Sequence, residues 1–461
     1  MTTSRFSRRE FIEYAAAAAG AAVLAGPSFA AARRADTKLR VLSIGVIGTI
    51  GGADRKTIAS HPLAEIVGLC DVDSNALAEA AKDHPDAFRC ADYREAFDKY
   101  GDRFDGVIVA TPDHSHCAIM TLALSRGKHL YAQKPLVQQL EELEILARAA
   151  GARPKLVTQT GAQRIEHAAR RAAVDILKSG GLGRVIEVHV TFGGGALAGG
   201  HYFADGVLGE PIEPPPGFDY NLWLNGAAEE PCRPQMVRRQ WRSWWNYGGG
   251  QINDWVVHLT DVLFYSFPEL RSPIRVCSRT PSRDLTHFHA DRVLSTLTYP
   301  VSGDRFANST CNFYFYDTNM KPDRAQIGLG EGEWPSGINT IVVCEGGTLV
   351  LAPEGPLEIW RGGQKTDGMQ WPGLPAYEKF NHWHAWVDKA LGKETPHLWM
   401  PLDIGLRCTE PGLLAVKAAK YPGQVLEWDR GTLTFTNHAE ATGTIVRREY
   451  RAGFEPVRIG A

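Results

Sequence analysis

Short apolar runs that alternate with helix-length segments constrain the fold of this chain most strongly. Residues 39–47, 64–70 and 106–110 are rich in Val, Ile and Leu, and we expect each of them to form a buried strand. Strands separated by helices form parallel sheets, because each crossover is right-handed and lays its helix across the sheet. The pattern therefore predicts an α/β fold with a doubly wound parallel sheet over residues 37–160.

The character of the sequence changes after Gly161. Residues 185–192 and 294–299 alternate apolar and polar side chains, prolines cluster within residues 211–216, and tryptophans are dense between Trp223 and Trp255. Such alternation is typical of antiparallel or mixed sheets. We therefore expect residues 161–461 to form a separate α+β domain.

The composition limits the classes of function. The chain has 461 residues, 44% of them hydrophobic, and a formal net charge of -2. It is long enough for two substantial cores, and its near-neutral charge gives no electrostatic reason to expect nucleic acid as a partner. The eight cysteines are widely spread without a Cys-x-x-Cys pair, so we expect mostly buried thiols.

The first 32 residues have the features of a removable export signal. Arg8 and Arg9 precede an alanine-rich run at residues 15–25, and Ala30, Ala31 and Ala32 form a small-residue cleavage site. Paired arginines indicate the Tat translocase, which transports folded proteins. The run is shorter than the roughly 20 residues of a membrane span, so we expect a periplasmic or extracellular protein without a stable membrane anchor. A buried alanine-rich helix is the alternative.

A glycine-containing turn follows the first expected strand. It contains Gly48, Thr49, Ile50 and Gly51. Glycine lets the backbone approach a pyrophosphate, which then rests on the N-terminus of the next helix. Ile50 stands where the Gly-x-Gly-x-x-Gly pattern has its second glycine, so either Gly51 takes that role in a longer loop or the phosphate lies differently. A glycine turn that holds no ligand is the alternative.

Asp71 strengthens the nucleotide interpretation. It ends the second expected strand, roughly 20 residues past the glycines, where a carboxylate can accept hydrogen bonds from the adenosine ribose. Its charge would repel a 2′-phosphate and therefore favours NAD as the cofactor over NADP, which is the second choice. A helix N-cap is the structural alternative for this aspartate.

Several motifs occur in the order that one known family shows. They are Thr111-Pro112-Asp113-His114-Ser115-His116, Gln133-Lys134-Pro135, Gly161-Ala162-Gln163-Arg164, Asp219-Tyr220-Asn221-Leu222-Trp223 and Gly248-Gly249-Gly250-Gln251-Ile252-Asn253-Asp254. Taken together, they resemble the Gfo/Idh/MocA family of nicotinamide-dependent sugar oxidoreductases over nearly the whole chain after the signal. The resemblance implies an N-terminal Rossmann domain, and a C-terminal domain with a large open-faced mixed sheet that usually makes the contacts of a homo-oligomer.

The resemblance also implies which residues meet the cofactor. In addition to the glycine turn and Asp71, these are Thr111, Pro112, His116, Gln133, Lys134 and Gln163. Lys134 matches the catalytic lysine of the family's Glu-Lys-Pro motif. Here Gln133 replaces the glutamate, which removes a negative charge next to the lysine.

A second cluster consists of Asp254, His258 and Asp261. Spacings of four and three residues place them on one stripe of a helix. A histidine can remove a hydroxyl proton while a carboxylate orients it, and the resemblance implies these roles for His258 and Asp254, with Asp261 in support. A structural helix and a divalent metal site are the alternatives, and we expect no metal because hydride chemistry needs none.

We expect the catalytic lysine, the Asp254 and His258 pair, and residues near them to contact the substrate. Lys134, Asp254 and His258 would meet the carbohydrate, and Arg164, Trp245 and Tyr247 would extend the site. Aromatic faces pack well against sugar rings, although plain core packing is an equal interpretation of the two aromatic residues.

These features predict hydride transfer between NAD and a secondary alcohol of a sugar, polyol or sugar derivative. His258 would act as general base with Asp254 orienting it, and Lys134 would stabilise the developing alkoxide. An exported enzyme of this kind should hold its cofactor tightly.

Rival interpretations belong to other classes. One is a redox-neutral, NAD-dependent glycosidase, which oxidises a ring carbon of the sugar, expels the glycosidic group by elimination and then returns the hydride. A related one is a transhydrogenase that transfers hydride between two sugars. The segment from Asp254 to His258 departs from the Tyr-Pro-Thr-His type segment of the family's glycosidases and favours the oxidoreductase. Another is a non-catalytic sugar-binding protein.

Overall fold

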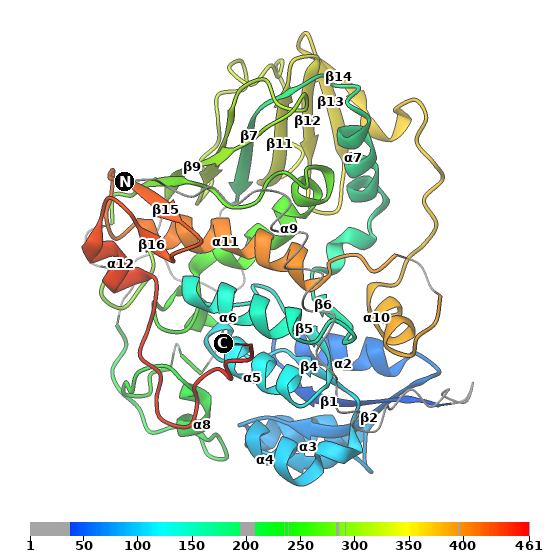
Figure 1. The fold of residues 1–461 in the computed structure, drawn as a ribbon, viewed down its shortest axis with the longest axis vertical. Coiled ribbons are helices and arrows are strands. Elements are labelled where there is room, and N and C mark those ends of the chain that lie inside the picture. Colours follow the sequence, from blue (N-terminus) through cyan, green and yellow to red (C-terminus); the bar gives the residue numbers. More distant parts are fainter. Residues whose placement is uncertain are drawn as a thin grey trace, which may run out of the picture. The chain divides into compact units, whose positions relative to one another are not determined.

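Two sheets organise the part of the chain that the computed structural model describes (Figure 1). The described residues are 37–460 without 194–207, 235, 238, 283–284, 291 and 395–396. The expected export signal, residues 1–32, lies outside them, as does part of the loop region after Gly193. Residues Lys38–Ala461 form one compact unit.

The first sheet is parallel and has six strands in the order β3-β2-β1-β4-β5-β6. These strands are β1 Leu39–Ile44, β2 Ala64–Cys70, β3 Phe88–Cys90, β4 Gly106–Val109, β5 His129–Ala132 and β6 Thr158–Thr160. The three strands expected from sequence are confirmed, although β1 ends early because the backbone turns at Gly45, where φ is +81°. The strand order reverses between β1 and β4, the point at which open α/β sheets bind ligands.

Helices connect the strands and cover the sheets. They are α2 Gly51–Ala59, α3 Ser74–Asp83, α4 Tyr93–Tyr100, α5 Asp113–Ser125, α6 Leu140–Gly151, α7 Ala168–Ser179, α8 Tyr220–Leu224, α9 Gly250–Ser266, α10 His382–Ala390, α11 Leu402–Ala418 and α12 Ala439–Ile445.

The second sheet is mixed and has ten strands in the order β14-β13-β12-β11-β7-β10-β9-β8-β15-β16. They are β7 Val185–Phe192, β8 Arg275–Arg279, β9 Leu294–Pro300, β10 Thr310–Tyr316, β11 Ile338–Cys344, β12 Gly347–Leu351, β13 Leu357–Arg361, β14 Gln364–Asp367, β15 Val425–Asp429 and β16 Thr434–Phe435. Strands β7 and β10 run parallel, whereas β9 is antiparallel to β10. A parallel sheet followed by a mixed sheet confirms the expected fold class.

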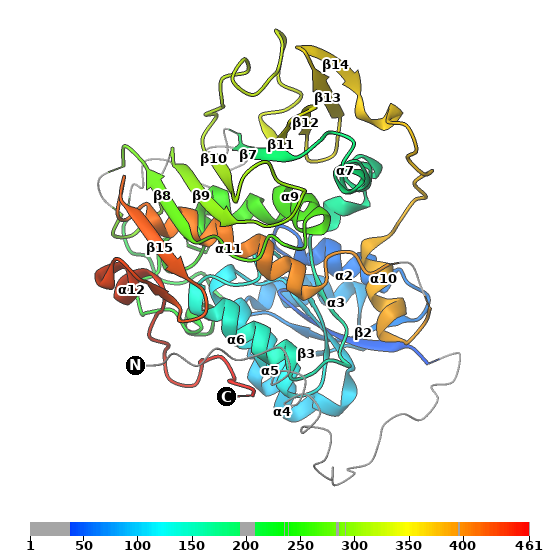
Figure 2. The ribbon, with the colours of Figure 1, turned by 45° about the horizontal axis from the view of Figure 1, so that its top comes forward.

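Two long helices join the sheets. Helices α9 and α11 pack against each other beneath the second sheet, and α11 also contacts α6 and β6 of the first domain (Figures 1 and 2). Val256, Val257 and Leu259 of α9 are fully buried in the core that they share. The helix that carries the second predicted cluster is therefore held rigidly against both halves.

A late segment of the chain completes the first domain. Helix α10 packs on α2, and its Trp386 is fully buried with Ile108 and Tyr131 of the first sheet. A Cβ atom on Gly106 would lie 2.9 Å from the Trp386 ring, so the glycine in β4 makes room for the indole.

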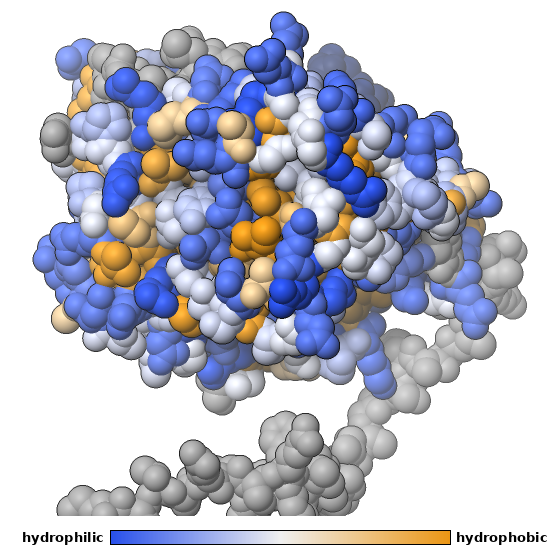
Figure 3. All heavy atoms as spheres, turned by 90° about the horizontal axis from the view of Figure 1, so that it is seen from above, coloured by the Kyte–Doolittle hydropathy of each residue, from blue (hydrophilic) through white to orange (hydrophobic). Residues whose placement is uncertain are grey.

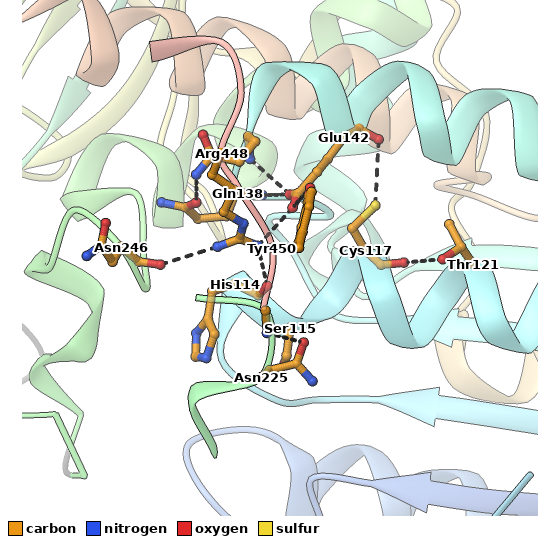
Figure 4. Close-up of polar contacts among 12 residues, drawn as sticks. His114, Ser115, Cys117, Thr121, Gln138, Glu142, Asn225, Asn246, Arg448 and Tyr450 are labelled. Carbon is orange, nitrogen blue, oxygen red and sulfur yellow. Dashed lines mark hydrogen bonds and ion pairs between the residues drawn. The ribbon is translucent and has the colours of Figure 1, made fainter. Parts of the chain in front are cut away.

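The C-terminal segment is fastened to the first domain by Glu142, a fully buried residue of α6 (Figure 4). One carboxylate oxygen accepts hydrogen bonds from the backbone N–H groups of Gln138 and Gln139, each at 2.9 Å. The other oxygen accepts from Arg448 and from the Tyr450 hydroxyl, each at 2.8 Å. Because every bond satisfies a charge that water cannot reach, this cluster fixes residues 448–450 over α5 and α6.

The described surface has a mixed character. Figure 3 shows hydrophobic residues in separate patches among hydrophilic ones on the face seen from above. Ile186 of β7 and Val425 of β15 are among the exposed large hydrophobic residues. No described helix is both long enough and apolar enough to cross a bilayer. All eight cysteines are unpaired, and seven of them are buried.

Replacing Arg448 by methionine should destabilise the protein by about 3–5 kcal/mol, because Glu142 would keep a buried charge without its cation. The measurement is the free energy of unfolding from urea titration. Arg458→Met is the matched control, since Arg458 pairs with Glu141 at 3.1 Å while its own side chain is 57% exposed. Exposed pairs contribute less than about 1 kcal/mol. Equal small losses in both variants would contradict the assigned role of Glu142.

Candidate functional site

A cavity of about 500 Å³ is lined by residues of both domains. Its wall includes the turn after β1, the ends of β2 and β4, the segment after β5, and the first turns of α9. Of the predicted site residues, the wall contains Gly48, Thr49, Ile50, Asp71, Thr111, Pro112, Gln133, Lys134, Gln163, Arg164, Asp254 and His258. One cavity thus brings together most of the residues singled out from sequence.

The turn after β1 suits a pyrophosphate. Gly48 has a φ of +66°, and a Cβ atom there would meet no other atom within 4 Å. Helix α2 begins at Gly51, and its N-cap, Ile50, provides no side-chain hydrogen bond. A helix N-terminus without a side-chain cap has N–H groups to offer to an anion. The donors present therefore fit the phosphates of a dinucleotide.

Gly51 allows α2 to pack closely against the end of β1. A Cβ atom on Gly51 would lie 2.3 Å from the carbonyl oxygen of Gly45, so only glycine allows the helix to start this close to the strand. Gly51 is buried and is not part of the cavity wall. Its predicted contact with the cofactor finds no support in this position, and close packing of helix on strand explains the residue.

Asp71 lies in the cavity wall at the end of β2. Its carboxylate accepts hydrogen bonds from the backbone N–H groups of Val46, at 2.9 Å, and Asp73, at 3.1 Å. Burial raises the pKa of Asp71, and these two hydrogen bonds oppose the rise. The N-cap of α3 is Asp73 rather than Asp71, so Asp71 braces the turn after β1 and still faces the cavity.

His116 ties two turns of the site together. Its Nδ1 lies 2.9 Å from the carbonyl oxygen of Pro135, and its Nε2 lies 2.8 Å from that of Thr111. The ring is buried and is not part of the cavity wall. The predicted role at the nicotinamide is therefore indirect in this structure: His116 positions Thr111 and the segment around Lys134.

Gln133 contacts a carboxylate that sequence reasoning missed. Its side-chain amide donates to Asp54 of α2 at 2.8 Å, and Trp383 of α10 donates to the other Asp54 oxygen at 2.7 Å. Asp54 is fully buried, and burial raises its pKa to about 7. A Cβ atom on Gly161 would lie 2.5 Å from the Gln133 nitrogen, so this glycine is needed for the contact. The only sequence signal was an acidic residue directly after the glycine turn.

Lys134 and Asp254 form the central contact of the site. The ammonium group of Lys134 donates to the Asp254 carboxylate at 2.9 Å and to its backbone carbonyl at 2.7 Å. The Nε atom of Arg242 lies 3.5 Å from the same carboxylate oxygen. The three side chains are at most 14% exposed, so one carboxylate is shared by two cations in a largely dehydrated place.

His258 lies one helical turn after Asp254 on α9 and is buried in the cavity wall. Burial lowers its pKa well below the usual value, and the positive charges of Lys134, Arg164 and Arg170 lower it further, whereas Asp254 opposes them. Its Nδ1 is buried without a hydrogen-bond partner. The imidazole is therefore neutral at physiological pH, as a proton acceptor must be.

Asp261 serves α9 rather than the cavity. It forms a fully buried ion pair with Arg170 of α7 and accepts a hydrogen bond from the Val262 N–H at 2.7 Å. Within the described ranges, no group of three or more His, Cys, Asp or Glu side chains is arranged to hold a metal ion.

Trp245 and Tyr247 are packed away from the cavity wall. The Trp245 ring lies 3.9 Å from the ammonium nitrogen of Lys420, and Tyr247 is fully buried with its ring 4.9 Å from that of Trp223. Their predicted contact with substrate finds no support in these positions, because core packing accounts for both rings.

Arg242 and Asp113 also line the cavity, and neither was predicted as a site residue. Arg242 and Trp241 follow the proline-rich loops, and the Arg242 guanidinium lies 4.3 Å from the centre of the Trp241 ring. Asp113 begins α5 and is buried, and its burial and the nearby charge of Asp254 raise its pKa well above the usual value. No periodic pattern marks these positions, since tertiary contacts alone bring them to the cavity.

Comparison with protein families agrees with this geometry. Residues 39–160 match the family model described as an oxidoreductase family, NAD-binding Rossmann fold. Residues 169–299 match the model described as an oxidoreductase family, C-terminal alpha/beta domain. The two matches together span both halves of the cavity.

Similar curated proteins and structures are known. Inositol 2-dehydrogenase 3 from Saccharopolyspora erythraea is 28% identical over 150 residues, which are 32% of this chain and 43% of that protein. The dTDP-3,4-didehydro-2,6-dideoxy-alpha-D-glucose 3-reductase from Streptomyces antibioticus is 28% identical over 160 residues, covering 33% and 46%. The chain thus spans less than half the length of these relatives.

The WlbA dehydrogenase from Bordetella pertussis, solved in complex with NADH and UDP-GlcNAcA, has a TM-score of 0.57 and 16% identity. The superposition covers 85% of this chain and 99% of that one. At 16% sequence identity, this similarity shows a shared fold and nothing more.

The Asp54 carboxyl predicts a pH dependence of stability. Folding raises its pKa from 3.8 to about 7, so its stabilising contribution is full below pH 3.8 and is lost as pH rises through about 7. Relative to wild type, Asp54→Asn should therefore gain up to about 1.4 kcal/mol per pH unit between these limits. Urea titrations at several pH values measure this difference. Asp86→Asn, at an exposed site, should show no such trend, and parallel curves for wild type and Asp54→Asn would contradict the assignment.

Proposed function

Because the chain belongs to the Gfo/Idh/MocA family of oxidoreductases, we propose that it transfers a hydride between a nicotinamide dinucleotide and a secondary alcohol of a sugar, polyol or sugar derivative. The observation that carries the proposal is one cavity wall that contains Lys134, Asp254 and His258 together with the glycine turn after β1. The names of the curated relatives, an inositol dehydrogenase and a sugar-nucleotide reductase, support the substrate class.

The residues that would hold the dinucleotide are the turn at Gly48 and Thr49, the N-terminus of α2, and Asp71. The bound nicotinamide would supply the site that accepts or donates the hydride. NAD is the proposed form, because the Asp71 carboxylate can bond a ribose hydroxyl and would repel a 2′-phosphate.

His258 and Lys134 would have different roles at the reacting alcohol. The neutral His258 ring would take the hydroxyl proton. The Lys134 ammonium group, held in place by Asp254, would donate a hydrogen bond to the reacting oxygen and stabilise its developing negative charge. Asp254 would serve both groups: it orients the ammonium, and its charge opposes the lowering of the pKa of His258.

Export and tight cofactor binding remain part of the proposal. The paired Arg8 and Arg9 before an alanine-rich run support Tat-dependent transport of a protein that has folded around its cofactor. Native mass spectrometry of the purified protein tests this: a mass that includes one dinucleotide is the expected result, and a bare chain that binds none would contradict the proposed activity itself.

Replacing Lys134 by methionine should lower kcat/KM about 10²- to 10³-fold, because the alkoxide loses its charged donor. The measurement is the rate of NADH formation with the best sugar or polyol. Lys155→Met is the matched control, since Lys155 is exposed on a loop after α6 and loses the same charge.

Two results would contradict this assignment. Equal rates in the Lys134 and Lys155 variants would remove Lys134 from the mechanism. Release of nitrophenol from an aryl glycoside without net NADH formation would identify the redox-neutral glycosidase instead.

Replacing Asp71 by asparagine should shift the cofactor preference toward NADP. Removing the charge removes repulsion of the 2′-phosphate while one oxygen remains to accept a backbone hydrogen bond, so the ratio of the NADP Kd to the NAD Kd should fall about tenfold or more. Titration of both cofactors into apoprotein measures the ratio. Asp86→Asn, at an exposed position, should leave it unchanged, and an unchanged ratio in the Asp71 variant would place the ribose elsewhere.

A further inference from the structure

The cavity around His258 has more positive than negative charge. Lys134, Arg164, Arg239 and Arg242 all line it. The Asp254 carboxylate is shared between Lys134 and Arg242. The ion partner of Arg164 is Glu354, whose side chain is 60% exposed, so that solvent screens this pair. The cations of the wall therefore outnumber the one buried carboxylate that Lys134 and Arg242 share.

Asp113 is a further acidic residue of the cavity wall. It is 3% exposed, and its burial and the nearby charge of Asp254 raise its pKa well above the usual value, which disfavours its charged form. Asp71 and Asp73 also line the cavity, where they accept hydrogen bonds from backbone N–H groups of the turn after β1 and of α3. Neither forms an ion pair with Arg164 or Arg242: Arg164 is paired with the exposed Glu354, and Arg242 shares Asp254 with Lys134.

Both guanidinium groups also carry a donor that is not used. The Nε atom of Arg164 and the Nε atom of Arg242 are buried, and neither has a hydrogen-bond partner. Arg242 approaches Asp254 only at 3.5 Å. Arg164 is held over the Trp255 ring, 5.0 Å from its centre, which restricts where the guanidinium can lie. Buried donors of this kind are normally satisfied by an acceptor.

We propose that the substrate is a sugar acid, and that Arg164 and Arg242 bind its carboxylate while Lys134 and His258 act on a hydroxyl of the same molecule. The inference rests on the proposed hydride transfer and names its substrate class. A carboxylate matches the planar guanidinium fork, because its two oxygens can accept two parallel N–H bonds.

A bound carboxylate also acts on the proton acceptor. The positive charges of Lys134 and Arg164 lower the pKa of His258. An anion beside Arg164 opposes this effect, so the imidazole becomes a stronger base when the acid is bound. A neutral sugar leaves the base weak. Discrimination between an acid and its neutral analogue therefore acts on kcat as well as on KM.

The test compares matched sugars on the holoenzyme. D-glucuronate and D-gluconate are the acids, D-glucose and D-sorbitol are their neutral counterparts, and D-glucose 6-phosphate carries the other anion. NADH formation gives kcat and KM for each compound. At least one acid should exceed its neutral counterpart about a hundredfold in kcat/KM, with part of the gain in kcat.

Arg242 variants test whether this preference for the acid depends on the arginines. In Arg242→Gln the ratio of kcat/KM between acid and neutral sugar should fall at least tenfold, and Arg242→Lys should restore part of it because the charge returns. Arg271→Gln, an exposed arginine with the same charge change, is the control and should keep the wild-type ratio.

The outcomes separate this inference from the proposed function. A neutral sugar that is oxidised as well as its acid overturns the inference and leaves hydride transfer in place, and so does a preference for the phosphate. If no compound yields NADH, hydride transfer on these sugars fails, and isothermal titration of the holoprotein with D-glucuronate and D-glucose decides the inference alone. Tighter binding of D-glucuronate, lost in Arg242→Gln, supports it, and equal binding overturns it.

Discussion

The contact between Lys134 and Asp254 is the interaction on which the site depends. Lys134 follows the last residues of β5 in the first sheet, whereas Asp254 belongs to α9 under the second. Their separation of 2.9 Å fixes the ammonium group opposite the helix that carries His258. Gln138 adds a buried bond from the same segment to the Trp245 carbonyl, at 2.6 Å. Chemistry that needs groups from two domains is thus held by short polar contacts between them.

Burial decides the charge state of the acidic and basic groups around the cavity. It raises the pKa values of Asp54 and Asp113 and lowers that of His258, because each charged form would lose its hydration. Lys134 and Asp254 are instead paired with each other. The same lack of water strengthens every remaining electrostatic interaction, which is why the positive charges of Arg164 and Arg242 have consequences for the choice of ligand.

Local patterns in the sequence were sufficient for several strands, and the family resemblance supplied many of the predicted residues that line the cavity. Apolar runs predicted β1, β2 and β4, and the spacing of Asp254 and His258 predicted one helical stripe, because both signals arise within a few residues. Asp54 and Arg242 were missed since their partners lie far away in sequence: Asp54 meets Trp383, and Arg242 meets Asp254. The burial of Trp245 follows from contacts with α11 and its end, which no local pattern reveals.

The anchoring of the C-terminal segment on Glu142 has a consequence for biosynthesis. The carboxylate belongs to α6, whereas its cationic partner, Arg448, is translated long after that helix. Arg448 also donates to the carbonyl oxygen of His114, at 2.5 Å, in the first turn of α5. Because 306 residues separate the two partners, a nascent chain lacks this contact until Arg448 has left the ribosome.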